Sequence, residues 1–231
     1  ATYTAKTVGK DLKATLKLAE WTKGSTSDAY AIHVLEFGSI TVNDHQFSMN
    51  DGFPTTGFVG ATFTLNLKDG VSASDVDWKV DGGDGWVSVN NGVVKFTGEG
   101  TSSKVTITAT PKTGGGTAKY SFNLKTWFVH DGTERTWSSA NSYCQSQSMS
   151  LPTRAQLTNG TESTDASRAG NSLWSEWGDI RSYGFAVHSW ASEAASGSTH
   201  YYVHLSNGNV GSGSDSNTGG YSISVMCQRG L

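Results

Sequence analysis

The first half of this sequence alternates apolar and polar residues in short runs, and this pattern limits the fold more than any other feature. A period of two places the apolar side chains on one face of a β-strand. Turn signals such as Asp69-Gly70 separate successive runs. Short strands joined by such turns predict a β-sandwich. The clearest runs are residues 3–7, 12–18, 62–67, 76–80, 104–108 and 119–124.

The use of charged residues changes abruptly near residue 125. Residues 1–125 contain twelve lysines and no arginine, whereas residues 126–231 contain five arginines and no lysine. Five of the eight tryptophans also lie in the second part. A compositional shift of this kind predicts a domain boundary at Lys125–Thr126.

The composition excludes several classes of partner. The formal net charge is −3 and there is no basic run, so nucleic acid and anionic membrane surfaces are poor partners. No apolar stretch approaches the ~20 residues that cross a bilayer, so we expect no direct membrane insertion by this chain. It has 28 glycines and begins at Ala1 within a strand-like pattern. We therefore expect a fragment of a longer, exported, β-rich polypeptide.

The two cysteines, Cys144 and Cys227, are 83 positions apart, unlike the close pairs of a metal site. Two interpretations remain open: two unrelated buried thiols, or one long-range disulfide formed in an oxidising compartment. We favour the disulfide, which would stabilise a loop of this length by roughly 4–5 kcal/mol.

The second part combines helical and strand signals. Trp137, Ala140 and Cys144 are spaced i, i+3 and i+7, which predicts one face of a helix, with Thr136 or Ser138 as its N-cap. A second short helix is expected after Leu151-Pro152, with Thr153 as its cap. Strands are then predicted at residues 201–205 and 221–227.

Residues 38–125 resemble bacterial Ig-like domains, which occur in tandem on surface adhesins. The resemblance rests on Trp78, Val87-Ser88-Val89, Asn91-Gly92-Val93-Val94, a glycine-rich turn and residues 105–109. It implies a domain over residues 37–125 with Trp78 in the core between two sheets. Residues 1–36 resemble the truncated end of a preceding Ig-like repeat; the alternative is that they pair with the next domain.

Residues 126–231 are similar to the C-type-lectin-like fold. The matching residues are Trp137, Ala140, Cys144, Leu151-Pro152-Thr153 and Cys227. The resemblance implies that Cys144 and Cys227 form a disulfide between the first helix and the last strand. It also implies that residues 174–178 enter the central strands and the long loop. The expected fold is mostly β: an Ig-like β-sandwich followed by an α+β lectin-like domain.

Ig-like repeats that end in a lectin-like module are the arrangement of the intimin/invasin family of inverse autotransporter adhesins. The resemblance implies an outer-membrane anchor, an Ig-like stalk and a C-terminal module that binds a host protein. The expected partner is a cell-surface receptor or a secreted glycoprotein, with immunoglobulin-type proteins among the candidates. This fragment would be the monomeric, extracellular tip at the bacterial cell surface.

Sugar binding, metal binding and catalysis have little support in the sequence. The sequence lacks the motifs of calcium-dependent lectins, which are Glu-Pro-Asn or Gln-Pro-Asp in the long loop and Trp-Asn-Asp on a strand. Asp165, Asp179 and Asp215 are isolated. His200 and His204 would lie too far apart on a strand to share one zinc ion. We expect no cofactor, no metal and no enzyme activity. The alternatives are a phage or prophage receptor-binding tip and a true carbohydrate-binding lectin.

Five residues are the candidate ligand contacts, because residues 177–183 mix aromatic and charged side chains on a segment that should be exposed, and because tryptophan is enriched at binding hot spots. They are Trp177, Asp179, Arg181, Tyr183 and Trp190.

Overall fold

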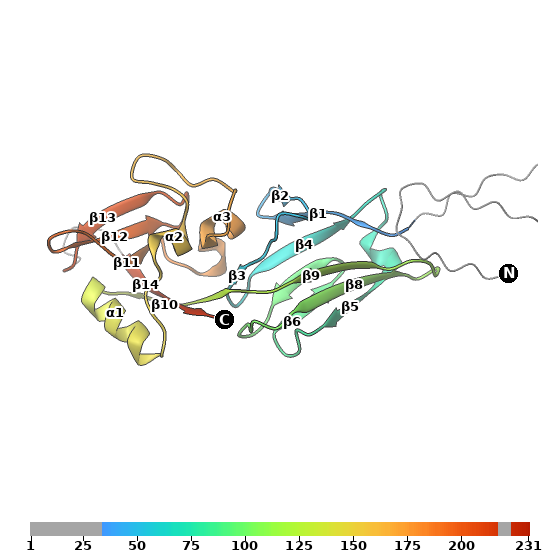
Figure 1. Ribbon diagram of the computed structural model, residues 1–231, viewed down its shortest axis with the longest axis horizontal. Helices are drawn as coiled ribbons and strands as arrows, with labels where there is room; N and C mark the ends of the chain where they lie inside the picture. The colour runs from blue at the N-terminus through green and yellow to red at the C-terminus, as the bar shows by residue number, and fades with distance from the viewer. Residues whose placement is uncertain (1–33, 217–222) are drawn as a thin grey trace, which may run out of the picture.

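The computed structural model of the chain describes residues 34–216 and 223–231. The strands predicted before residue 34, and the first two residues of the last predicted strand, lie outside the described residues. Two parts, the N-terminal part (34–125) and the C-terminal part (126–231), follow one another along the long axis (Figure 1). Within these ranges no helix has both the length and the apolar character that a membrane span requires.

The N-terminal part is an antiparallel β-sandwich, as the alternating pattern predicts. One sheet has the order β2-β1-β4-β7-β6 and the other β5-β8-β9. The first sheet contains β1 (Phe37–Val42), β2 (His45–Phe47), β4 (Thr62–Leu67), β6 (Val87–Asn90) and β7 (Val93–Phe96). The second contains β5 (Val76–Asp81), β8 (Val105–Pro111) and β9 (Ala118–Phe122), with the 3-10 helix η1 (Ala73–Asp75) before β5.

The C-terminal part packs three short helices and a 3-10 helix against one six-stranded sheet, of order β13-β12-β11-β14-β10-β3. The strands are β3 (Thr56–Gly57), β10 (Thr126–Glu134), β11 (His188–Ser196), β12 (Thr199–His204), β13 (Val210–Ser214) and β14 (Ile223–Gly230). The helices are α1 (Trp137–Ser146), α2 (Arg154–Leu157), α3 (Leu173–Trp177) and η2 (Arg181–Tyr183).

The two predicted helix caps are present. Thr136 Oγ1 accepts a hydrogen bond from Ser139 N at the start of α1. Thr153 forms a capping box with Gln156, in which the Thr153 side chain and the Gln156 side chain each accept from the other residue's backbone N–H. The predicted disulfide between Cys144 of α1 and Cys227 of β14 is also confirmed.

Strand pairing crosses the predicted boundary at residue 125. β3 comes from the N-terminal part, yet it pairs in parallel with β10 of the C-terminal part. The Lys125 and Thr126 amides both donate to Thr55 O, at 2.6 and 3.2 Å. The domain boundary at residue 125 stays a prediction. The six-stranded sheet contains strands from both the N-terminal and the C-terminal part.

The core residue predicted for the sandwich is confirmed only in part, because Trp78 packs against the core without being fully buried. Trp78 is only half-buried, because β5 is the edge strand of its sheet, and its ring stacks against Phe37 at a centroid distance of 5.9 Å. Trp86 is buried instead and packs edge-on against Phe96 and Trp127, at 5.3 and 6.3 Å. The sandwich core therefore reaches the first strand of the C-terminal part.

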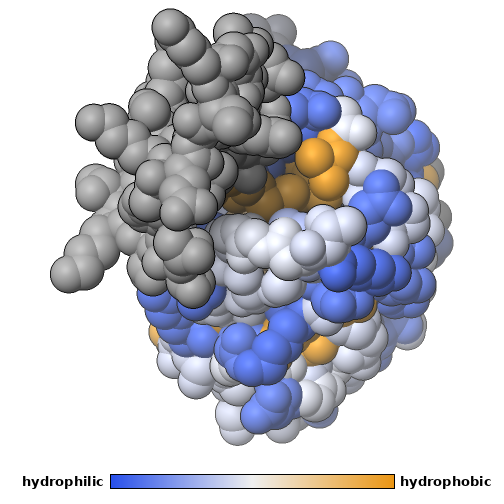
Figure 2. Space-filling view, turned by 90° about the vertical axis from the view of Figure 1, so that its right-hand side faces the viewer, coloured by the Kyte–Doolittle hydropathy of each residue, from blue (hydrophilic) through white to orange (hydrophobic). Residues whose placement is uncertain are grey.

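The far end of the sandwich is hollowed. Figure 2 views this end and shows an orange apolar area beside mostly hydrophilic surface. A hollow of about 660 Å³ lies there between the β4–η1 and β8–β9 connections, and its walls include Leu35, Val71 and Pro111.

Candidate functional site

The five predicted contact residues do not share one surface. Asp179 and Tyr183 are half-buried, and Arg181 is exposed. Trp177 and Trp190 each have 0 % of their surface exposed, which corrects the expectation that they touch a ligand. The physical reason is that an indole ring contributes a large apolar area, and both rings fill the interior instead of the surface.

Helix α3 positions the predicted contact segment. Residues 174–178 lie mainly in this helix and not in central strands, which corrects the expectation drawn from the family resemblance. Ser172 Oγ caps the helix by accepting from Ser175 N at 3.2 Å, and Gly178 ends it with a φ of 69°. A Cβ at Gly178 would lie 2.5 Å from Arg168 Nη1, so glycine is required here for two reasons.

Asp179 and Arg181 form an exposed ion pair directly after α3. Arg181 Nη2 and Nε donate to the Asp179 carboxylate at 2.6 and 2.9 Å, and Arg181 N donates to Asp179 Oδ1 at 3.0 Å. The Arg181 side-chain hydrogen bonds hold the pKa of Asp179 below its usual range. This carboxylate is therefore ionised, and the pair presents both charges to solvent in one geometry.

A β-turn of the N-terminal part supports this segment. Val42 pairs with His45, which leaves Asn43-Asp44 as a two-residue hairpin loop with φ values of 44° and 62°. Both values are positive, as a type I′ turn requires. Asn43 Nδ2 donates to Trp177 O at 2.7 Å and to Asp179 O at 3.2 Å.

Arg168 forms a second link between the parts. Its Nε donates to Ser175 O at 3.0 Å, and its Nη2 donates to Glu176 O at 2.9 Å and to Val42 O at 3.2 Å. Burial lowers the pKa of Arg168, because the charged guanidinium is partly removed from water. Three carbonyl oxygens thus offset the desolvation of this cation.

Tyr183 is held by the N-terminal part as well. Its hydroxyl lies 3.2 Å from Thr62 Oγ1, at hydrogen-bond distance, and its ring packs edge-on against Phe58 at 5.2 Å. These contacts make Tyr183 a support of the segment, with only part of the ring left for a partner.

Glu176 lies at the centre of the junction, with only 1 % of its surface exposed. Its Oε1 accepts from the backbone N and hydroxyl of Thr55 at 2.7 and 2.8 Å, and its Oε2 accepts from those of Thr56 at 2.8 and 2.5 Å. Trp177 Nε1 donates to the same Thr56 hydroxyl at 2.9 Å. Burial raises the pKa of Glu176 to about 7, although the four hydrogen bonds act in the opposite direction.

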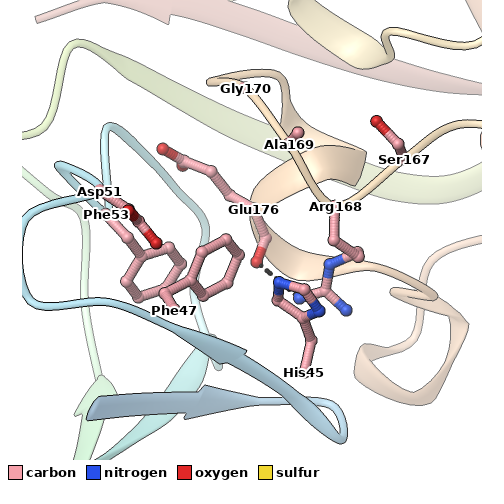
Figure 3. Close-up of a pocket in the computed structure, with 9 residues that line it drawn as sticks. All are labelled: His45, Phe47, Asp51, Phe53, Ser167, Arg168, Ala169, Gly170 and Glu176. Carbon is pink, nitrogen blue, oxygen red and sulfur yellow. Dashed lines mark hydrogen bonds between the residues drawn. The ribbon is translucent and has the colours of Figure 1, made fainter. Parts of the chain in front are cut away.

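Two hollows, each of about 520 Å³, open beside these links and share His45 and Arg168. We call them together the junction groove. The first is drawn in Figure 3, where the dashed line marks the hydrogen bond from Arg168 to Glu176 O. Its walls are His45, Phe47, Asp51, Phe53, Ser167, Arg168, Ala169, Gly170 and Glu176. The second is lined by Asn43, Asp44, His45, Arg168, Trp174, Gly178, Asp179, Ser182 and Ser206.

Sequence reasoning missed most of the residues that build this groove. Asn43-Asp44 carries a hairpin signal, since it separates two alternating runs, and that signal was available. Glu176 also carries a sequence signal, because a carboxylate between Trp174 and Trp177 in a short apolar helix needs a buried partner. Arg168 lies in a polar loop and carries no such local signal.

Known proteins with a similar sequence or structure agree with this architecture. Residues 38–122 match the family model described as invasin, domain 4. The inverse autotransporter adhesin YeeJ of Escherichia coli (strain K12) is 35 % identical over 181 residues, which cover 74 % of this chain and 7 % of that protein. The chain therefore spans only a small part of this relative.

Two solved structures have the same arrangement. A crystal structure of invasin, described as a bacterial integrin-binding protein, has a TM-score of 0.73 and 25 % identity, covering 86 % of this chain and 40 % of that one. A C-terminal fragment of intimin, in complex with the intimin-binding domain of the translocated intimin receptor, has a TM-score of 0.61 and 15 % identity. It covers 88 % of this chain and 71 % of the fragment, and at that identity it supports the fold alone.

Proposed function

This chain belongs to the intimin/invasin family of adhesins, and from that premise we propose that it binds a host protein through its C-terminal, lectin-like part. In this proposal residues 37–125 are an Ig-like domain of the stalk, and residues 126–231 are the binding module at the extracellular tip. The partner is a cell-surface receptor or a secreted glycoprotein, bound by a monomer.

The observation that carries the proposal is the exposed Asp179–Arg181 pair on a buried support. The two side chains are 41 % and 45 % exposed, while the backbone beneath them is held by Asn43. A charged pair in a fixed geometry can recognise a partner at little cost in conformational entropy. The relatives are adhesins, and the invasin structure is described as that of an integrin-binding protein, which supports a protein partner here.

The test is binding of the 231-residue chain to human cells before and after two treatments of the cell surface. Protease treatment should abolish binding, and enzymatic removal of glycans should leave it unchanged. Binding that survives protease but is lost with the glycans would contradict the proposal and favour a lectin.

A double variant locates the contact. Asp179→Asn combined with Arg181→Gln should raise Kd at least about tenfold, which corresponds to about 1.4 kcal/mol for a central interface residue pair. The matched control is Asp81→Asn with Lys79→Gln, because this pair is equally short at 2.6 Å but lies on β5 of the sandwich. Equal effects of the two double variants would exclude the Asp179–Arg181 pair as the contact.

A further inference from the structure

Arg168 differs from the other arginines of the C-terminal part. Within residues 34–216 and 223–231, it alone of these five arginines forms no ion pair with a carboxylate. The pairs of the other four are Arg135–Asp131, Arg154–Glu193, Arg181–Asp179 and Arg229–Glu99. A partly buried cation without an anion is the exception in a folded protein.

The guanidinium of Arg168 also has donors to spare. Of its five N–H groups, the one on Nε and the two on Nη2 serve the three carbonyl oxygens described above. The two on Nη1 have no acceptor among the described residues. Nη1 is not fully buried, because it is absent from the set of buried atoms without a hydrogen-bond partner, and it therefore reaches solvent. It lies beside Gly178 in the second hollow of the groove.

The imidazole of His45 lines both hollows of the groove, and charges of the groove affect its pKa. Burial is the main cause that lowers the pKa of His45, and the positive charge of Arg168 lowers it further. Asp51 acts in the opposite direction, with a smaller effect than Arg168. Arg168 thus has a larger effect at His45 than Asp51 has, although the carboxylates of Asp44, Asp51 and Asp179 also line the groove.

We propose that the junction groove binds a carboxylate side chain, aspartate or glutamate, of the partner protein, with Arg168 Nη1 as its donor. This inference rests on the proposed function and names the chemistry of one contact. Charge-assisted hydrogen bonds to a guanidinium are the strong kind, and partial burial weakens their screening by water.

The test is an NMR titration of the full chain with acetate, at an ionic strength held constant with chloride. Acetamide, which has nearly the same shape without the charge, is the control probe. Acetate should cause saturable shifts of the backbone amides of Gly178 and His45, and acetamide should not. Shifts that are absent, that do not saturate, or that are equal for the two probes would overturn the proposal.

Three variants sharpen the result. Asp51→Asn removes the opposing charge and should tighten acetate binding about twofold, an exposed-charge effect. Arg154→Gln removes an arginine that lines neither hollow and should bind acetate as the native chain does. Arg168→Gln should abolish the shifts; if this variant does not fold, the Asp51→Asn result decides, because unchanged binding there contradicts the assignment.

This titration uses no host cells, so its outcome can be distinguished from the outcome of the cell-binding test of the proposed function. Acetate shifts without any cell binding would support the carboxylate site and refute adhesion. Cell binding without acetate shifts would leave the proposed function in place and refute the carboxylate site.

Discussion

The two apolar clusters of the described residues are stabilised by different polar and covalent links. The large cluster runs from the sandwich into the C-terminal part, through Phe53, Phe96, Trp127 and Trp177, and it is joined at the junction by the buried carboxylate of Glu176. The small cluster lies between α1 and the sheet, within the C-terminal part, and contains the disulfide. The buried carboxylate joins the two parts of the molecule, whereas the disulfide strengthens only the C-terminal part.

The largest expected effect is that of Trp177→Ala. Its ring packs against Phe53, Phe58, Phe63 and Phe96, so truncation should destabilise the chain by about 3–5 kcal/mol. Trp190→Ala is the matched control, because Trp190 is equally buried but belongs to the small cluster. Hydrogen exchange should show that only Trp177→Ala lowers the protection of β4 and β7. Equal loss in both variants would contradict the division into two clusters.

Removal of the disulfide should have the next largest effect. Cys144→Ala with Cys227→Ala opens a loop of 83 residues and should cost about 2–5 kcal/mol in urea unfolding. The amides of α1 and β14 should lose protection, while those of β1 and β4 keep it. Loss of protection throughout the sandwich would show that the small cluster is not confined to the C-terminal part.

Glu176→Gln should have a smaller effect that depends on pH. The amide nitrogen that replaces one carboxylate oxygen cannot accept a hydrogen bond, so one buried backbone N–H is left without a partner, at about 1–3 kcal/mol. The native carboxyl has a folded pKa of about 7 against an ordinary value of 4.5, so its contribution to stability is greatest below pH 4.5. That contribution falls as the pH rises through 7, since ionisation is disfavoured by burial.

The difference in unfolding free energy between the native chain and Glu176→Gln should therefore be widest below pH 4.5 and narrow towards pH 7. Urea titrations across this range measure it. Glu162→Gln, at an exposed glutamate, is the control and should leave the profile unchanged. A difference that widens as the pH rises would contradict the cause given for the raised pKa.

The smallest expected effect on stability is that of Arg181→Gln. The Asp179–Arg181 pair is more than a third exposed on both sides, so its loss should cost less than about 1 kcal/mol in thermal unfolding. A larger loss would show that the pair holds the junction together and is not mainly a binding surface.

Local patterns in the sequence predicted the local structure well. The strands predicted at residues 62–67 and 104–108 are formed as β4 and β8, although β8 begins one residue later and ends three residues later than predicted. Thr153 caps α2 because a threonine three residues before a glutamine suits a capping box. These features depend on neighbours in the chain, so a single sequence contains the information.

The candidate site could be predicted only in part, for a physical reason. Asp179 and Arg181 are two residues apart, and their pairing is local. The contacts of Glu176 with Thr55 and Thr56 join residues about 120 positions apart, so no local pattern reports them. The burial of Trp177 follows from the same packing, because the apolar rings that cover it come from the sandwich.

The central claim is that the buried junction belongs to the large apolar cluster and holds the binding surface on the sandwich. Native-state hydrogen exchange of the Thr55 and Thr56 amides tests it most directly, since both donate to Glu176. The account predicts that they exchange with the same free energy as the core amides of β4, which belong to the same cluster. Exchange of these two amides at a much lower free energy, while β4 stays protected, would contradict it.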